Sequence, residues 1–275
     1  MANEIALKPS YWASVSGGKD SLYMLYYILN HLDKYPLDGV CHFELEIDYP
    51  FIKNVIDYME SECKKHNIRF VRIKPRKTWE ELYKKYNFPT RINRWCNNHY
   101  KLDAKKQLVE FMKSLGYNTY FYIGYCKDEM RRYDKRNSNI LKEVYPLVEG
   151  WGVLEQDIWE WAKTQPIFND YYKYNKRCGC MFCPMSSLLN LAYLYKYYPQ
   201  NFECMVSKMR ESEKNVSEKL GRPFVIRGKN PKYNADYVEN IVKTKWLKKL
   251  EEIDKRPTQL NLFDKLRNDG GNNDN

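Results

Sequence analysis

The sequence has 275 residues, of which 43% are hydrophobic and 29% are charged. This length suits one large domain, or one domain with a smaller addition, and the composition excludes a wholly disordered or fibrous chain. No apolar run is long enough to span a membrane and the first residues show no signal peptide, so we expect a cytoplasmic protein without a membrane partner. The formal net charge of +11 suits a polyanion such as nucleic acid.

The first half of the chain alternates short apolar runs with amphipathic stretches. Strands are expected at Tyr11–Val15, Val40–Ile47, Ile68–Ile73 and Thr119–Ile123. Helices are expected at Asp20–His31, Phe51–His66, Thr78–Tyr86 and Asp103–Leu115. Thr78 with Glu81 has the spacing of a capping box, and Asp103 is a plausible cap of the last of these helices. The alternation predicts an α/β fold with a doubly wound, mostly parallel sheet, which binds ligands beyond the carboxyl ends of its strands.

The pattern changes near Tyr145, and the second half of the chain is mainly helical. Helices are expected at Asp157–Lys163, Ser186–Tyr198, Phe202–Leu220 and Tyr237–Ile253. We therefore expect three parts: an α/β domain at 1–150, a Cys-rich segment with a helical region at 151–256, and a disordered tail at 257–275.

A glycine-rich loop stands between the first predicted strand and the first predicted helix. It consists of Ser16, Gly17, Gly18, Lys19, Asp20 and Ser21. Two glycines allow a tight turn and close approach of a ligand, and the helix that follows offers unpaired N–H groups to an anion. The two serines add hydroxyl groups and Lys19 adds charge, whereas Asp20 suits an N-cap or a group that orients the loop and approaches a metal ion. The loop predicts a phosphate site; the alternative is a glycine-rich turn that binds nothing.

This loop resembles the Ser-Gly-Gly-x-Asp-Ser loop of the PP-loop ATP pyrophosphatase superfamily. Further stretches resemble its branch of phosphoadenosine phosphosulfate (PAPS) reductase-like proteins. They are Glu46–Asp48, Arg94–Cys96, Gly124–Arg132, Tyr145–Leu147, Trp151, Asp157–Trp159 and Gly179–Pro184. The resemblance covers about residues 10–190 and is strongest for cluster-containing sulfurtransferases such as DNA phosphorothioation enzymes.

The resemblance implies an enzyme that binds ATP, or a PAPS-like nucleotide, together with Mg²⁺. It implies that the nucleotide contacts Ser16, Gly17, Gly18, Lys19, Asp20, Ser21, Gly124, Glu129 and Arg132. It also implies catalytic roles for Lys19, Asp20, Asp48 and Arg132. The α/β domain at 1–150 would then be the nucleotide-binding domain.

Three cysteines lie within six positions, at Cys178, Cys180 and Cys183, and Cys96 lies in a second predicted loop. Such thiols can hold an iron–sulfur cluster or a zinc ion, form a redox pair, or be unrelated buried thiols. The resemblance favours a 4Fe–4S cluster on Cys96, Cys180 and Cys183, with Cys178 as the fourth ligand; without Cys178, one iron would stay open.

The remaining cysteines and the histidines carry weaker signals. Cys41, Cys63 and Cys204 lie in apolar strand or helix patterns and are expected in the core, whereas the role of Cys126 is open. The histidines are expected to have structural roles; they are His31, His42, His66 and His99.

Three functions remain open at this point. The first is an ATP-dependent, adenylating sulfurtransferase that works with a sulfur donor protein and modifies nucleic acid. The second is a reductase of a phosphosulfate nucleotide, although the Glu-Cys-Gly-Leu-His motif of such reductases is absent and no Cys follows Cys204. The third is a non-catalytic module that binds a nucleotide and zinc in a DNA-associated assembly.

The predicted tail contains one apolar string, Gln259–Phe263. It resembles the Gln-Leu-x-Leu-Phe peptide by which bacterial DNA-processing proteins dock on the replication sliding clamp. The alternative is that its apolar side chains cap the protein's own core.

Overall fold

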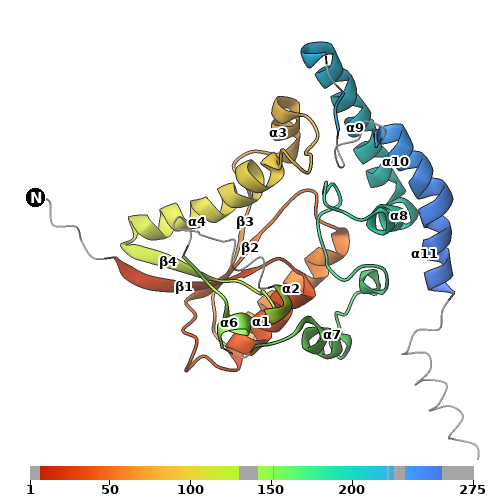
Figure 1. Cartoon of the computed structure of the whole chain (residues 1–275). Helices are drawn as coiled ribbons and strands as arrows, with labels where there is room; N and C mark the ends of the chain where they lie inside the picture. Colours follow the sequence, from red (N-terminus) through yellow and green to blue (C-terminus); the bar gives the residue numbers. More distant parts are fainter. Residues whose placement is uncertain (1–6, 130–141, 151, 222, 226–232, 256–275) are drawn as a thin grey trace, which may run out of the picture. The chain divides into compact units, whose positions relative to one another are not determined.

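The computed structural model of the chain describes residues 7–129, 142–150, 152–221, 223–225 and 233–255 (Figure 1). Arg132, Trp151 and Gln259–Phe263 lie outside these residues, so what the sequence predicts for them stays a prediction. The chain divides into two compact units. The first holds residues up to Asp170 together with Arg177–Pro184, and the second holds Tyr171–Lys176 and the residues from Met185 onward.

The first unit is built on a five-stranded sheet in which all neighbouring strands are parallel, in the order β3-β2-β1-β4-β5. Its strands are β1 (Lys8–Val15), β2 (Gly39–Phe43), β3 (Phe70–Ile73), β4 (Tyr117–Tyr122) and β5 (Lys142–Val144). The predicted doubly wound, parallel α/β fold is confirmed. The strand order reverses between β1 and β4, and parallel sheets bind ligands beyond the carboxyl ends of their strands at such a point.

Helices cover both faces of this sheet (Figure 1). The described α-helices of this unit are α1 (Lys19–Leu29), α2 (Pro50–Lys65), α3 (Trp79–Tyr86), α4 (Leu102–Ser114), α6 (Pro146–Glu149) and α7 (Glu155–Lys163). Leu108 and Met112 of α4 pack on Trp12, Cys41 and Phe121 of the strands to form a core on one face. On the opposite face lie α1 and α2.

Two helix starts test the predicted caps. The capping box of α3 is confirmed, because Thr78 Oγ1 accepts from the Glu81 amide at 3.1 Å and the Glu81 carboxylate accepts from the Thr78 amide at 2.7 Å. Asp103 as a cap is wrong. A π-helical turn, Cys96–Lys101, leads directly into α4, so Asp103 lies inside the first turn and its carboxylate accepts from the Arg76 amide at 2.9 Å instead.

The second unit is helical, with α8 (Leu188–Tyr197), α9 (Pro199–Leu220), α10 (Ala235–Ile241) and α11 (Leu247–Asp254). The sequence predicts one continuous helix over Tyr237–Ile253, but a π-helical turn at Val242–Trp246 joins α10 to α11. Among the described helices, none is both long and apolar enough to cross a membrane.

A buried ion pair joins α4 to β5. The Lys105 Nζ lies 2.7 Å from a carboxylate oxygen of Glu143, and both side chains are only 6% exposed. The Tyr145 hydroxyl donates to the other carboxylate oxygen at 2.5 Å. The ammonium also lies 4.3 Å from the centre of the Phe121 ring. This pair ties the three-residue edge strand β5 to α4.

Replacing Lys105 by Met is expected to lower the free energy of unfolding by about 3–5 kcal/mol, because the Glu143 carboxylate stays buried without its cation. The matched control is Lys106→Met, since Lys106 is the exposed neighbour on the same helix and should change stability by less than about 0.5 kcal/mol. Denaturant unfolding measures both. Equal, small losses for the two variants would show that the buried pair contributes little.

Candidate nucleotide and thiolate site

The phosphate loop, Ser16–Ser21, joins β1 to α1 and is closed by its own serines. The Ser21 hydroxyl accepts from the Ser16 amide at 3.1 Å and donates to the Gly18 carbonyl at 2.9 Å. Gly17 has φ +75°, and a Cβ there would lie 2.8 Å from Cγ2 of Ile52. The cap of α1 is Gly18 and not Asp20, which lies in the first turn. The loop therefore presents backbone amides at the positive end of a helix.

Lys19 and Asp20 form a buried charge pair behind this loop. The Lys19 Nζ lies 2.6 Å from Asp20 Oδ1 and 3.2 Å from Glu155 Oε1. Burial alone would lower the pKa of Lys19, but the two carboxylates outweigh it and the pKa is raised. Burial raises the pKa of Asp20 against the effect of Lys19, and the Glu129 and Glu155 carboxylates add to the rise. Lys19 is thus charged, and a phosphate must compete with these carboxylates for it.

The loop after β4 packs directly against the first turn of α1. A Cβ on Gly124 would lie 2.7 Å from the Asp20 carbonyl oxygen, so only glycine allows this approach. The Cys126 thiol lies 3.9 Å from Asp20 Oδ1. Burial raises the pKa of this thiol, and the charge of Asp20 raises it further. The buried Glu129 carboxylate pairs with Arg177 Nη1 at 2.7 Å. Glu129 therefore connects this loop to the residue that precedes Cys178.

The Cys-rich segment Arg177–Pro184 belongs to the first unit, although the residues on both sides of it belong to the second. Besides the ion pair of Arg177, the Met181 amide donates to the Ile47 carbonyl at 2.8 Å. These contacts fasten the segment beside the turn that follows β2. Cys180 is buried, whereas Cys178 and Cys183 are half-buried.

Lys101, at the end of the π-helical turn, lies among the thiols. The charge of Cys180 is the largest cause that raises the pKa of Lys101, and Asp48, Cys183 and Cys96 raise it further. Burial of the ammonium opposes the rise but does not cancel it. A hydrogen bond with Cys183, together with burial, raises the pKa of Cys180 well above its usual range. One ammonium therefore interacts with three thiols that come from distant parts of the sequence.

These thiols fit a metal centre in kind and in grouping. Thiolates are the ligands that zinc and iron–sulfur clusters take. Cys183 interacts with both Cys96 and Cys180, and all three thiols interact with Lys101. As they stand, no three His, Cys, Asp or Glu side chains among the described residues are arranged to hold a metal ion. Ligation would thus require the thiolates to turn toward a common point.

One cavity joins the loop to this group. It has a volume of about 120 Å³ and lies beyond the carboxyl ends of β1 and β2. Ser16, Asp48, Lys101, Cys178 and Cys180 line it. Burial raises the pKa of Asp48 to about 6, with Lys101 opposing the rise. Burial of the Cys178 thiol raises its pKa to about 12, and the charge of Asp48 contributes to the rise.

His42 also lines this cavity and was expected to be merely structural. Its Nδ1 lies 3.0 Å from the Val15 carbonyl oxygen, so Nδ1 carries a proton and the neutral ring keeps Nε2 as an acceptor. Burial lowers the pKa of His42. A neutral base therefore faces the cavity at pH 7.

Because the imidazole of His42 is held neutral, acid should weaken the fold through it. The unfolded chain binds a proton near pH 6.5 that the folded chain refuses, so the free energy of unfolding falls as the pH drops below about 6.5. We expect the stability difference between the wild type and His42→Gln to shrink from about pH 7.5 to about pH 5. Denaturant unfolding at both pH values measures it.

The control for this experiment is His99→Gln, since His99 is exposed and stacks on Tyr86 with ring centres 5.2 Å apart. Comparing the two variants separates the effect of the buried imidazole from that of replacing an exposed one. A difference for His42→Gln that grows in acid would contradict the neutral, buried state of His42.

The cysteines outside the site differ in their burial. Cys41 and Cys63 are fully buried, as expected, and burial raises the pKa of each to about 12. Cys204 as a core residue is wrong, because it lies on the exposed side of α9.

No protein-family model matches the chain. Two uncharacterized proteins of Methanocaldococcus jannaschii are each 26% identical to it, over 211 and 235 residues. The alignments cover 72% and 81% of this chain but 47% and 45% of theirs. The chain thus spans about half the length of the curated relatives it matches.

Several solved structures are similar to the chain. The U34-tRNA thiolase NcsA of Methanococcus maripaludis, with its 4Fe–4S cluster, shares 13% identity and a TM-score of 0.41 over 94% of this chain and 77% of its own. The PAPS reductase of Candida auris shares 12% and a TM-score of 0.36 over 56% and 72%. The NH3-dependent NAD synthetase of Campylobacter jejuni shares 15% and a TM-score of 0.31 over 90% and 88%.

These identities and TM-scores are low, so the resemblance of the sequence to the PP-loop superfamily stays a prediction. The parallel sheet with helices on both faces is the α/β architecture that the sequence predicts. A function for the chain must therefore be argued from its own residues.

Proposed function

We propose that the chain is an adenylating sulfurtransferase: ATP, bound with Mg²⁺, activates an oxygen of a nucleic acid, and a sulfur nucleophile then displaces AMP. One observation carries the proposal. Ser16 of the phosphate loop, the Asp48 carboxylate, Lys101 and the thiols of Cys178 and Cys180 line the same cavity. A nucleotide bound at the loop would therefore have its α-phosphate close to the group of thiols.

The phosphates would be held chiefly by backbone amides. Gly17 and Gly18 bring the chain close to them, and the hydroxyls of Ser16 and Ser21 add donors. Lys19, together with Arg132, which lies outside the described residues, would offset the charge that develops on pyrophosphate as it leaves. Asp20 lies in the first turn of α1 and can approach the Mg²⁺ that accompanies ATP.

The acceptor oxygen needs a base and a hydrogen-bond partner. His42 keeps Nε2 as an acceptor while Nδ1 is held by Val15, so it can take the proton of the attacking hydroxyl. Asp48, with a pKa of about 6, is mostly ionised at neutral pH and can orient a hydroxyl of the nucleotide or the acceptor. The acceptor oxygen then forms its bond to the α-phosphorus as the bond to pyrophosphate breaks.

The thiols provide the sulfur side of the reaction. Cys96, Cys180 and Cys183 would hold a 4Fe–4S cluster, with Cys178 as its fourth ligand or with one iron open; zinc is the alternative occupant. When bound, such a cluster with an open iron supplies a place for sulfide next to the activated acceptor. Lys101 lies among the thiolates and offsets their charge. A sulfur donor protein would replenish the sulfide.

Nucleic acid is the proposed acceptor for two reasons. The net charge of +11 favours a polyanion. A structurally similar protein, NcsA, is a U34-tRNA thiolase. The string Gln259–Phe263 would in addition bring the enzyme to a sliding clamp if the acceptor is DNA.

The test is ATP-dependent transfer of radioactive sulfide into nucleic acid. Protein purified without oxygen is incubated with sulfide and Mg²⁺, and with total tRNA or genomic DNA, in the presence and absence of ATP. We expect label in one nucleic acid only when ATP is present. Asp48→Asn should reduce the rate at least about tenfold, whereas Glu44→Gln, on the same turn, should not. Label without ATP, or none with either nucleic acid, would overturn the proposal.

A further inference from the structure

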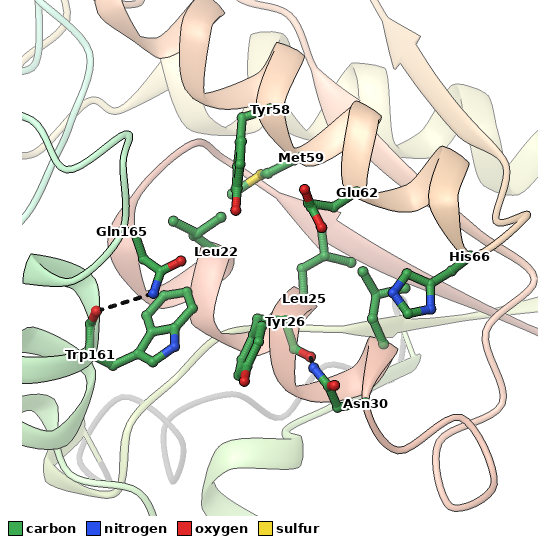
Figure 2. Close-up of a pocket in the computed structure, with 11 residues that line it drawn as sticks. Leu22, Leu25, Tyr26, Asn30, Tyr58, Met59, Glu62, His66, Trp161 and Gln165 are labelled. Carbon is green, nitrogen blue, oxygen red and sulfur yellow. Dashed lines mark hydrogen bonds between the residues drawn. The ribbon is translucent and has the colours of Figure 1, made fainter.

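A second cavity, of about 210 Å³, lies between α1, α2 and α7 (Figure 2). It shares no lining residue with the cavity at the phosphate loop. Its apolar side is formed by leucines on one face of α1, Leu22, Leu25 and Leu29, together with Met59 of α2. The volume lies below the ~300–1,000 Å³ of pockets that hold drug-sized ligands, so a single ring system suits it.

Three aromatic side chains surround this cavity, as Figure 2 shows. Tyr26 is 49% exposed, which is unusual for a large ring on a helix that faces other helices. The Trp161 ring lies 5.0 Å from that of Tyr26, centre to centre, and is buttressed edge-on by Tyr23 at 5.0 Å. Tyr58 lies across from them. Partly exposed rings around a small opening provide stacking surfaces for a flat ligand.

Asn30, Gln165 and Glu62 bring oxygen acceptors to the rim, and His66 adds an imidazole. The Asn30 amide nitrogen donates to the Tyr26 carbonyl at 2.7 Å, and that of Gln165 donates to Thr164 Oγ1 at 3.0 Å. Their side-chain oxygens are thereby left for a ligand. Glu62 adds a carboxylate, one oxygen of which accepts from the exposed Lys65 at 2.6 Å. Burial and the Glu62 carboxylate raise the pKa of Tyr58, which places that carboxylate near the ring.

We propose that this cavity binds a guanine base. Among the common bases, guanine alone presents two neighbouring N–H donors, at N1 and N2, which match the two oxygens of the Glu62 carboxylate. Adenine and cytosine present one amino group beside an acceptor, and uracil presents a single N–H between two acceptors. The aromatic rings then stack on the base.

The guanidinium of an arginine peptide is also flat and rich in N–H groups, but a chain with a net charge of +11 attracts a polyanion and repels a cationic partner. The guanine can come from a free nucleoside or from an unpaired position in a strand, since proteins that bind single strands stack splayed bases on aromatic side chains. The proposal does not depend on the sulfur transfer proposed above.

Calorimetry with guanosine, inosine and adenosine tests the base. These nucleosides lack phosphate, so the phosphate loop does not attract them. Guanosine should bind, inosine should bind about tenfold more weakly because it lacks the 2-amino group, and adenosine more weakly still. Glu62→Gln and Tyr26→Ala should each weaken guanosine binding about tenfold. Lys65→Gln, which removes the ion pair and keeps the carboxylate, should leave it unchanged.

Gly17→Val should retain guanosine binding, which separates this site from the nucleotide site. A single-stranded oligonucleotide with one guanine is compared with the same strand carrying inosine, to distinguish a free nucleoside from a base in a strand as the ligand. If the preference for guanine over inosine is stronger in the strand than between the free nucleosides, the ligand is nucleic acid. The proposal is overturned if guanosine binds no more tightly than adenosine, if Glu62→Gln has no effect, or if N-acetyl-arginine amide binds more tightly than guanosine.

Discussion

Gly17→Val should abolish ATP binding, with a loss of affinity of at least about a hundredfold. Gly17 has φ +75°, a conformation that a β-branched residue avoids, and its Cβ would lie 2.8 Å from Cγ2 of Ile52. The loop must therefore move away from α2, and the amides that would hold the phosphates move with it. Calorimetry with ATP and with PAPS measures the loss.

The matched control is Gly116→Val. Gly116 has φ +85° but nothing within 4 Å of a Cβ, so this variant carries the same kind of backbone strain, roughly 1–2 kcal/mol, away from the loop. It should bind ATP as the wild type does. Thermal melts of both variants verify that each is folded. If Gly17→Val binds ATP as tightly as the wild type, the loop is not the nucleotide site.

Cys96→Ser, Cys180→Ser and Cys183→Ser should each remove most of the bound metal. A hydroxyl is a poor substitute for thiolate at a soft metal, and the three thiols form one group around Lys101. If Cys178 is the fourth ligand, Cys178→Ser should lower the metal content as much as the other three variants do. If Cys178 is not a ligand, this variant should lower the metal content less than they do. Iron and zinc analysis and the visible absorption spectrum of protein purified without oxygen measure the result.

Two further cysteines serve as controls. Cys63 is fully buried in α2 and Cys204 is exposed on α9, and replacing either by Ser should leave the metal content unchanged. Iron with a visible absorption band supports the cluster, whereas zinc without iron supports the alternative. Wild-type protein that contains neither metal would contradict both.

Local sequence patterns predicted most of the fold because the elements carry their own signals. The capping box at Thr78 is a contact within four residues, and each strand from β1 to β4 coincides with an apolar run. The strand β5 has the sequence Lys-Glu-Val, which has no apolar pattern, and it is held by a lysine on α4 that is distant in sequence. The π-helical turn at Cys96–Lys101 likewise has no established sequence signature.

In the candidate site, too, local patterns could be predicted and long-range contacts could not. The phosphate loop is contiguous, so six neighbouring residues were enough to indicate it. Lys101 and His42 were missed because their roles depend on long-range placement: Lys101 lies five residues after Cys96, a spacing that shares a face in a π-helical turn but not in an α-helix. Asp20 as a cap failed because Gly18 takes the extended conformation of the N-cap, with ψ 155°.

The proposed reaction cleaves ATP between its α- and β-phosphates. Its products can be identified with ATP labelled at the α-phosphate, incubated anaerobically with the protein, Mg²⁺, sulfide and nucleic acid. We expect labelled AMP and free pyrophosphate, formed only with the nucleic acid that accepts sulfur and lost in Gly17→Val. Labelled ADP as the product would show cleavage at the γ-phosphate and contradict the proposed reaction.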